Sequence, residues 1–179
     1  MASAVDTLLH KGYGARREGK RLEAKRLFTE ALELSRKAED QDATAQALTG
    51  LGGIERDLGN SHIALKCYEE AAEIYRFRQN VLQLAHTIRH LGDIHYDAHH
   101  FDLAEPQFRK ALAIYRAHPE TPPLDLANAI RGYALLKGDT GDIQQARTLW
   151  KEAGDLYKQV NVLAGVEESQ RRLSALGHL

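Results

Sequence analysis

The sequence predicts an all-α solenoid of four antiparallel helix pairs with a capping helix at the carboxyl-terminal end. The main observation is an alanine–aromatic–alanine segment that begins at Ala24 and recurs at Ala64, Ala104 and Ala146, at intervals of 40, 40 and 42 residues. Self-similarity at a fixed period of this length is typical of stacked repeats. Within each repeat the apolar residues recur every three or four positions, as on one face of a helix. Turn residues such as Gly59-Asn60 interrupt this spacing, so each repeat reads as two helices.

Taken in order, these elements fill the 179-residue chain as a single domain. A helix pair of this kind cannot bury its apolar face alone and must stack on its neighbours. The stacking positions are aromatic on the second helices (Phe28, Tyr68, Phe108 and Trp150) and small on the first (Gly12, Gly52, Gly92 and Ala134). We predict repeats at about residues 3–39, 42–79, 82–118 and 123–160, and the capping helix at about 162–177.

Helix-start signals support this division. Asp102 with Glu105, and Asp142 with Gln145, predict a capping residue and its reciprocal partner at the start of two second helices. Pro106 is discordant, but it lies early enough in its helix to remove about one hydrogen bond and leave a mild kink. The helix prediction therefore stands for this segment.

Composition and charge exclude several classes of protein. With 43% hydrophobic and 27% charged residues, the chain can bury a core in the ordinary way. Lys and Arg number 24 against 25 Asp and Glu, so no net field attracts nucleic acid or an anionic membrane. A single cysteine, Cys67, allows no intramolecular disulfide, and the amino terminus lacks the basic start and apolar run of a secretory signal. We therefore expect a cytoplasmic protein that binds neither nucleic acid nor membrane.

The repeated residues resemble the tetratricopeptide repeat. Leu51-Gly52 and Leu91-Gly92 match its first-helix signature, and the alanine–aromatic–alanine segments match its second helix, over about residues 3–160. The period exceeds the usual length of about 34 residues and is similar to that of kinesin light chains and the Leu-Gly-Asn adaptors. The resemblance implies a right-handed superhelical solenoid that acts as a non-catalytic scaffold or adaptor, without a cofactor. Such a solenoid binds an extended peptide or a partner helix in a concave groove lined by the first helices.

The first helices depart from those relatives at one position. Where an asparagine that grips the peptide backbone commonly follows Leu-Gly, this chain has Tyr13, Gly53, Asp93 and Leu135. The resemblance therefore does not carry over the relatives' peptide specificity.

The outward residues of the first helices form the candidate binding site. Arginine occurs on all four helices and can hold a carboxylate or phosphate, which favours a protein or peptide partner with an acidic segment. The alternative is that the arginines pair with the aspartate row Asp57, Asp97 and Asp139 as solvated ion pairs, each worth about 0–1 kcal/mol. The candidate partner-binding residues are Tyr13, Arg16, Arg56, His86, Arg89, His90, Asp93, Tyr96, Asp97 and Arg131.

Histidines cluster in the third repeat, where His86/His90 and His95/His99 have the i,i+4 spacing of metal ligands. Against a metal, His95 stands where an aromatic residue normally packs between helices, and the catalytic His-Glu-x-x-His motif is absent. We favour a groove-lining role for His86 and His90, whose charge can change near neutral pH, and expect no bound metal.

A self-associating module and a metal-binding module that uses these histidines are the alternatives to a binding scaffold. Weak homo-oligomerisation is the structural alternative, because the amino-terminal end lacks a cap and Leu9 is expected to point into the groove there. Enzymatic activity is not predicted, since no nucleophile arrangement emerges. The glycines of residues 50–53 lie within a helical pattern and lack the Lys-Ser/Thr of a phosphate-binding loop.

Overall fold

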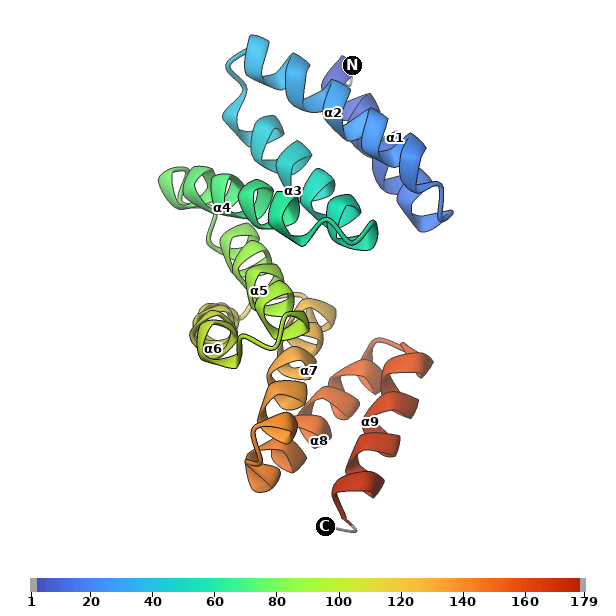
Figure 1. Cartoon of the computed structure of the whole chain (residues 1–179), viewed down its shortest axis with the longest axis vertical. Helices are drawn as coiled ribbons and strands as arrows, with labels where there is room; N and C mark the ends of the chain where they lie inside the picture. Colours follow the sequence, from blue (N-terminus) through green and yellow to red (C-terminus); the bar gives the residue numbers. More distant parts are fainter. Residues whose placement is uncertain (1–2, 178–179) are drawn as a thin grey trace. The chain divides into compact units, whose positions relative to one another are not determined.

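The computed structural model describes residues 3–177 and confirms the all-α fold class (Figure 1). Within these residues, nine helices form four pairs and a final single helix, and no strand occurs. None of the helices described is both long enough and apolar enough to cross a membrane. The first helices of the pairs are α1 (Ala4–Arg17), α3 (Gln41–Asp57), α5 (Val81–Asp97) and α7 (Pro123–Asp139). The second helices are α2 (Arg21–Lys37), α4 (Ser61–Phe77), α6 (Phe101–Ala117) and α8 (Ile143–Gln159), and the final helix is α9 (Leu163–Leu176).

The chain divides into two compact units, Met1–Thr87 (unit 1) and Ile88–Leu179 (unit 2), with the division inside α5. In unit 1, α1 packs on α2, α2 on α3, and α3 on α4. In unit 2, α6 packs on α7, α7 on α8, and α8 on α9. Because helices adjacent in sequence are adjacent in space, each unit has the stacked order of a repeat protein. The single domain and the repeat limits inferred from the sequence remain predictions.

The core of unit 1 forms around the aromatic rings of the second helices. Phe28 is fully buried, and both Gly12 and Gly50 lie against its ring. A Cβ atom on Gly12 would come within 2.8 Å of Phe28 Cε1, and one on Gly50 would lie closer still. Gly52 stands against Tyr68, where a Cβ atom would approach to 3.1 Å. The small and aromatic positions predicted from the sequence are therefore partners in the core, because only glycine lets the helix backbone approach the ring so closely.

Unit 2 repeats this arrangement. Phe108 and Trp150 are buried, with exposed fractions of 0% and 1%. A Cβ atom on Gly92 would lie 3.0 Å from Phe108 Cδ1, and one on Gly132 would lie 2.6 Å from Phe108 Cε1. Pro106 lies inside α6, which continues through it as one helix. The core of unit 2 is thus built on the same positions as that of unit 1.

The two predicted second-helix caps have different outcomes. The cap predicted at Asp142 is confirmed, because its Oδ1 accepts a hydrogen bond from the backbone N–H of Gln145 at 3.2 Å at the start of α8, while the reciprocal bond from the Gln145 side chain stays a prediction. The prediction for Asp102 is wrong, because α6 already begins at Phe101. The turn before α6 has its left-handed residue at His99, with φ 58°, and the helix starts shortly after it. Asp102 therefore lies inside the first turn, where it cannot act as the cap.

The carboxyl-terminal helix α9 has the character of a capping helix. In the register of the second repeat, Gln170 takes the position of Leu48 and Ser174 takes that of Gly52. Gln170 and Ser174 are exposed, whereas Leu48 is 2% exposed. The positions of a first helix that elsewhere face a second helix are polar here, while the other side of α9 packs on α8. A terminal helix needs such a solvated face because no further helix covers it.

The expectation for the amino-terminal end is wrong. Leu9 is buried, with an exposed fraction of 4%, and does not lie in a groove. Ser3 and Asp6 form a capping box at the start of α1, in which each side chain accepts the other's backbone N–H at 2.9–3.0 Å. Thr7 and His10 are exposed, so α1 supplies its own polar outer face. Leu9, the apolar residue that motivated self-association, is therefore not exposed.

Candidate functional site

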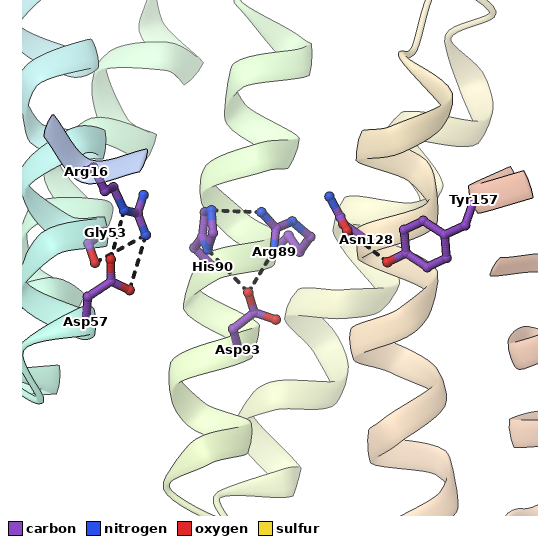
Figure 2. Close-up of polar contacts among 8 residues, drawn as sticks. All are labelled: Arg16, Gly53, Asp57, Arg89, His90, Asp93, Asn128 and Tyr157. Atoms are coloured by element: carbon purple, nitrogen blue, oxygen red, sulfur yellow. Dashed lines mark hydrogen bonds and ion pairs between the residues drawn. The ribbon is translucent and has the colours of Figure 1, made fainter. Parts of the chain in front are cut away.

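Arg16 in unit 1 is held by an ion pair between two first helices. It extends from α1 to α3, where its Nε donates to Asp57 Oδ2 at 2.9 Å and its Nη2 donates to Gly53 O at 3.4 Å (Figure 2). A Cβ atom at residue 53 would overlap the guanidinium, so glycine makes room for the contact. Both charged side chains are about one-third exposed, at 32% and 34%. This is the surface ion pair that the sequence offered as the alternative to ligand binding.

A tighter cluster lies on α5 in unit 2. Arg89 Nη1 donates to Asp93 Oδ2 at 2.7 Å, and Arg89 Nη2 lies 2.7 Å from His90 Nε2 (Figure 2). Because an arginine can only donate, His90 Nε2 is the acceptor, and the proton of the neutral imidazole lies on Nδ1. That nitrogen is 3.2 Å from Asp93 Oδ2. The side chains of these three residues are only 10–13% exposed, so they form one largely buried polar network.

Arg131 on α7 pairs with the capping helix. Its Nε and Nη2 donate to Glu168 on α9 at 2.6 and 2.9 Å in a bidentate arrangement. The predicted aspartate row supplies another contact instead, in which the Tyr96 hydroxyl donates to Asp139 Oδ2 at 2.5 Å. The sequence reasoning missed Glu168 because it treated α9 only as a cap. The available signal was the charge of Glu168 in a segment whose apolar residues predict a helix packed on the preceding one.

Two tyrosines of the second helices in unit 2, Tyr115 and Tyr157, are buried and interact electrostatically with Arg89. The hydroxyl of Tyr157 on α8 donates to Asn128 Oδ1 on α7 at 2.8 Å (Figure 2). At the equivalent position on α6, burial raises the pKa of Tyr115, while the nearby charge of Arg89 opposes that rise. Burial also raises the pKa of Asp125, again opposed by Arg89. The Arg89 network therefore extends to groups on α6 and α7.

Unit 1 contains a pocket of about 360 Å³ that is lined in part by Tyr13. The hydroxyl of Tyr13 donates to Gln46 O at 3.3 Å, and its ring packs edge-on against Phe28 at 4.9 Å between centroids. Burial, and secondly the neighbouring Tyr75, raise the pKa of Tyr13 to about 12. Of the ten candidate residues selected from the sequence, Tyr13 lines this pocket. The pocket is lined by Tyr13, Asp42, Gln46, Tyr75, Asn80 and Gln83.

The remaining candidate residues lie on the expected helices. Arg56 and His86 are partly buried on α3 and α5, and Asp97 is exposed at the end of α5. None of them is without an interaction partner. A binding role for any of the ten residues selected from the sequence remains a prediction.

The histidines of the third repeat do not assemble into a metal site in the described part of the chain. Within residues 3–177, no group of three or more His, Cys, Asp or Glu side chains is arranged to hold a metal ion. His99 has the left-handed backbone of the turn before α6. The rings of His95 and His100 are 6.5 Å apart between centroids. The hypothesis of a metal-binding module therefore gains no support from the geometry.

Comparison with known proteins identifies the repeat. The family model described as "Tetratricopeptide repeat" matches residues 3–76 and 50–117. No curated protein matches the sequence.

Several solved structures share the fold. BtubC (BKLC) from P. vanneervenii superposes with a TM-score of 0.76 at 22% identity, covering 88% of this chain and 64% of that protein. The Rap protein complexed with Competence and Sporulation Factor gives 0.78 at 18% identity, covering 96% and 48%. PilF of Pseudomonas aeruginosa gives 0.67 at 15% identity, covering 96% and 76%. The chain thus spans about half to two-thirds of the first two proteins, and the likeness at these identities concerns the fold alone.

Proposed function

Because the chain belongs to the tetratricopeptide repeat family, we propose that it is a non-catalytic protein-interaction module. It holds an extended peptide or a partner helix on the first helices of its repeats. The observation that carries this proposal is the polar pocket of unit 1, which is lined by residues of the first helices α1, α3 and α5 together with Tyr75 of α4 and Asn80. The Rap protein, a structural relative crystallised with Competence and Sporulation Factor, supports a ligand-holding role for a fold of this kind.

The ion pairs bear on the charge of the partner. Arg16, Arg89 and Arg131 each donate to a carboxylate of this chain. An acidic segment of a partner would have to displace these internal carboxylates, at the cost of leaving them unpaired. The proposed partner is therefore recognised chiefly through neutral polar groups, and the acidic segment expected from the sequence is the weaker candidate.

The proposed contact residues lie on the first helices. In unit 1 they are Tyr13 and Arg16, and in unit 2 they are His90, Asp93 and Tyr96. Arg56, His86, Arg89, Asp97 and Arg131 support them as neighbours on the first helices.

Selection of binders from a phage-displayed library of random 12-residue peptides tests the proposal directly. Hydrogen–deuterium exchange with a selected peptide should then show added protection on α1 and α3, or on α5 and α7, and little on the outer sides of α2 and α8. An absence of selectable peptides, or protection restricted to the second helices, would contradict the proposed function. Circular dichroism of the same preparation establishes that the chain is folded.

A further inference from the structure

The pocket of unit 1 has two phenol groups at its base. Tyr13 comes from α1 and Tyr75 from α4, and the two are close enough for Tyr75 to contribute to the raised pKa of Tyr13. Burial raises the pKa of both tyrosines. Both hydroxyls are therefore neutral hydrogen-bond donors at physiological pH.

The present bonds of these hydroxyls are long. The Tyr13 hydroxyl lies 3.3 Å from Gln46 O, and the Tyr75 hydroxyl lies 3.5 Å from Thr49 Oγ1. Typical O–H···O bonds in proteins are about 2.7–2.8 Å. A ligand oxygen at the base of the pocket can thus offer each hydroxyl a better acceptor at little cost.

The rim of the pocket is polar without carrying net charge. Asp42 accepts two hydrogen bonds from Arg78, at 3.2 and 2.9 Å, and the pair is neutral overall. Asn80 accepts a long bond of 3.4 Å from the backbone N–H of Gln83. In the part of the chain that the structure describes, the side-chain amides of Gln46 and Gln83 are exposed and make no hydrogen bond. These groups can donate to and accept from a neutral ligand.

We propose that this pocket selects a primary-amide side chain, that of glutamine or asparagine, from the peptide bound under the proposed function. The amide oxygen accepts from the hydroxyls of Tyr13 and Tyr75. The amide NH₂ donates to the second lone pairs of Asp42 or to the side-chain oxygen of Gln46. The pocket volume of about 360 Å³ lies within the usual range for small-ligand sites, roughly 300–1,000 Å³.

Other side chains fit this set of donors and acceptors less well. None of the described residues that line the pocket is cationic, so a carboxylate would find no ion-pair partner among them and would compete with Asp42 for Arg78. An ammonium group would have to compete with Arg78 for the carboxylate of Asp42. An apolar side chain would leave the amides and hydroxyls without partners after excluding water from them.

The test uses a peptide selected from the random 12-residue library, measured by fluorescence anisotropy against the whole chain. The selected sequences should share a glutamine or asparagine at a fixed position. Replacing that residue in the peptide by glutamate or leucine should weaken binding about tenfold. In the chain, Tyr13→Phe and Tyr75→Phe should each weaken binding about threefold to tenfold, because each removes one hydroxyl and keeps the ring.

Tyr133→Phe in unit 2 is the matched control. It removes a hydroxyl that donates to Glu105 at 3.2 Å and does not line the pocket, so the affinity should be unchanged. The two outcomes against the inference are distinguishable from failure of the proposed function. Selected peptides that lack a shared amide, or that bind the two pocket variants as tightly as the wild type, overturn the amide pocket alone. A library that yields no binder overturns the proposed function and the pocket together.

Discussion

The two units have a lysine–glutamate ion pair at equivalent positions, with the two charges exchanged between the helices. In unit 1, Lys25 Nζ on a second helix lies 2.8 Å from Glu55 Oε1 on the next first helix. At the equivalent positions of unit 2, Glu105 Oε1 lies 2.6 Å from Lys137 Nζ. The member on the first helix is the more buried in both units, with 2% of Glu55 and 12% of Lys137 exposed. Opposite charges therefore meet at this junction in both units, and both orientations occur.

A second ion pair keeps the same orientation in both units. Arg36 pairs with Glu70 in unit 1, and Arg116 pairs with Glu152 in unit 2, at equivalent positions and with the same orientation. These four side chains are 38–51% exposed. Exposed pairs of this kind contribute about 0–1 kcal/mol, so the more buried pair is the one whose rearrangement has consequences.

Charge reversal at the more buried pair should have the largest effect. Glu55→Lys places a second cation opposite Lys25 in a buried position and should reduce the free energy of unfolding by about 3–5 kcal/mol. The double variant Lys25→Glu/Glu55→Lys reproduces the orientation of unit 2 and should recover most of the loss. Recovery is incomplete because Asn60 Nδ2 donates to Glu55 at 2.7 Å only in the natural orientation. Urea denaturation measures both variants, and a double variant no more stable than Glu55→Lys would contradict the equivalence of the units.

Removing an arginine from a first helix should cost more stability in unit 2 than in unit 1. Arg89→Met leaves Asp93, which is 13% exposed, without its cation and should cost about 2–3 kcal/mol. Arg16→Met breaks a pair that is one-third exposed and should cost about 0–1 kcal/mol. Thermal denaturation of the two variants provides the comparison. Equal losses would mean that burial does not separate the two networks.

Glycine replacements should separate tight from open helix contacts within unit 1. Gly50→Ala forces a methyl group into the ring of Phe28 and should cost about 1–3 kcal/mol. Gly14→Ala on α1 meets nothing within 4 Å and should stabilise the chain by about 0.5–1 kcal/mol through helix propensity. Chemical denaturation should give opposite signs for the two variants. A loss of stability in Gly14→Ala would contradict the open space around residue 14.

The pH dependence of Glu55 should have a small effect on stability. Burial raises its pKa, but the hydrogen bonds from Lys25 and Asn60 outweigh this, so the pKa lies below its ordinary value of 4.5. The unfolded state therefore takes up the proton first, and the stabilisation by this carboxylate is present above pH 4.5 and is lost as the pH falls through the lower, folded-state value. Glu55→Gln should be less stable than the wild type by about 1 kcal/mol at pH 7 and should approach it as the solution is acidified. A difference that grows on acidification would reverse the assigned sign.

The elements and the core were accessible from the sequence to a large degree. The pairing of Gly12 with Phe28 and of Gly52 with Tyr68 follows from the register of the repeats, since each repeat places the same chemistry at the same helical position. Asp102 was misplaced because a helix start depends on the turn before it, and the left-handed residue of that turn is a histidine where other repeats have glycine.

The sequence by itself determined the repeat, the helix pairs and the aromatic and small positions of the core, because helical periodicity and self-similarity are properties of the chain read in order. Only the tertiary structure decided the partners of the polar side chains. Arg131 pairs with Glu168 and not with the aspartate row, and Tyr13, Gln46 and Tyr75 meet around one pocket. Such partners are distant in sequence: Arg131 and Glu168 lie 37 residues apart, and Tyr13 and Tyr75 lie 62 residues apart. Their meeting depends on which face of a neighbouring helix comes within a side chain's length, and periodicity alone does not specify that distance.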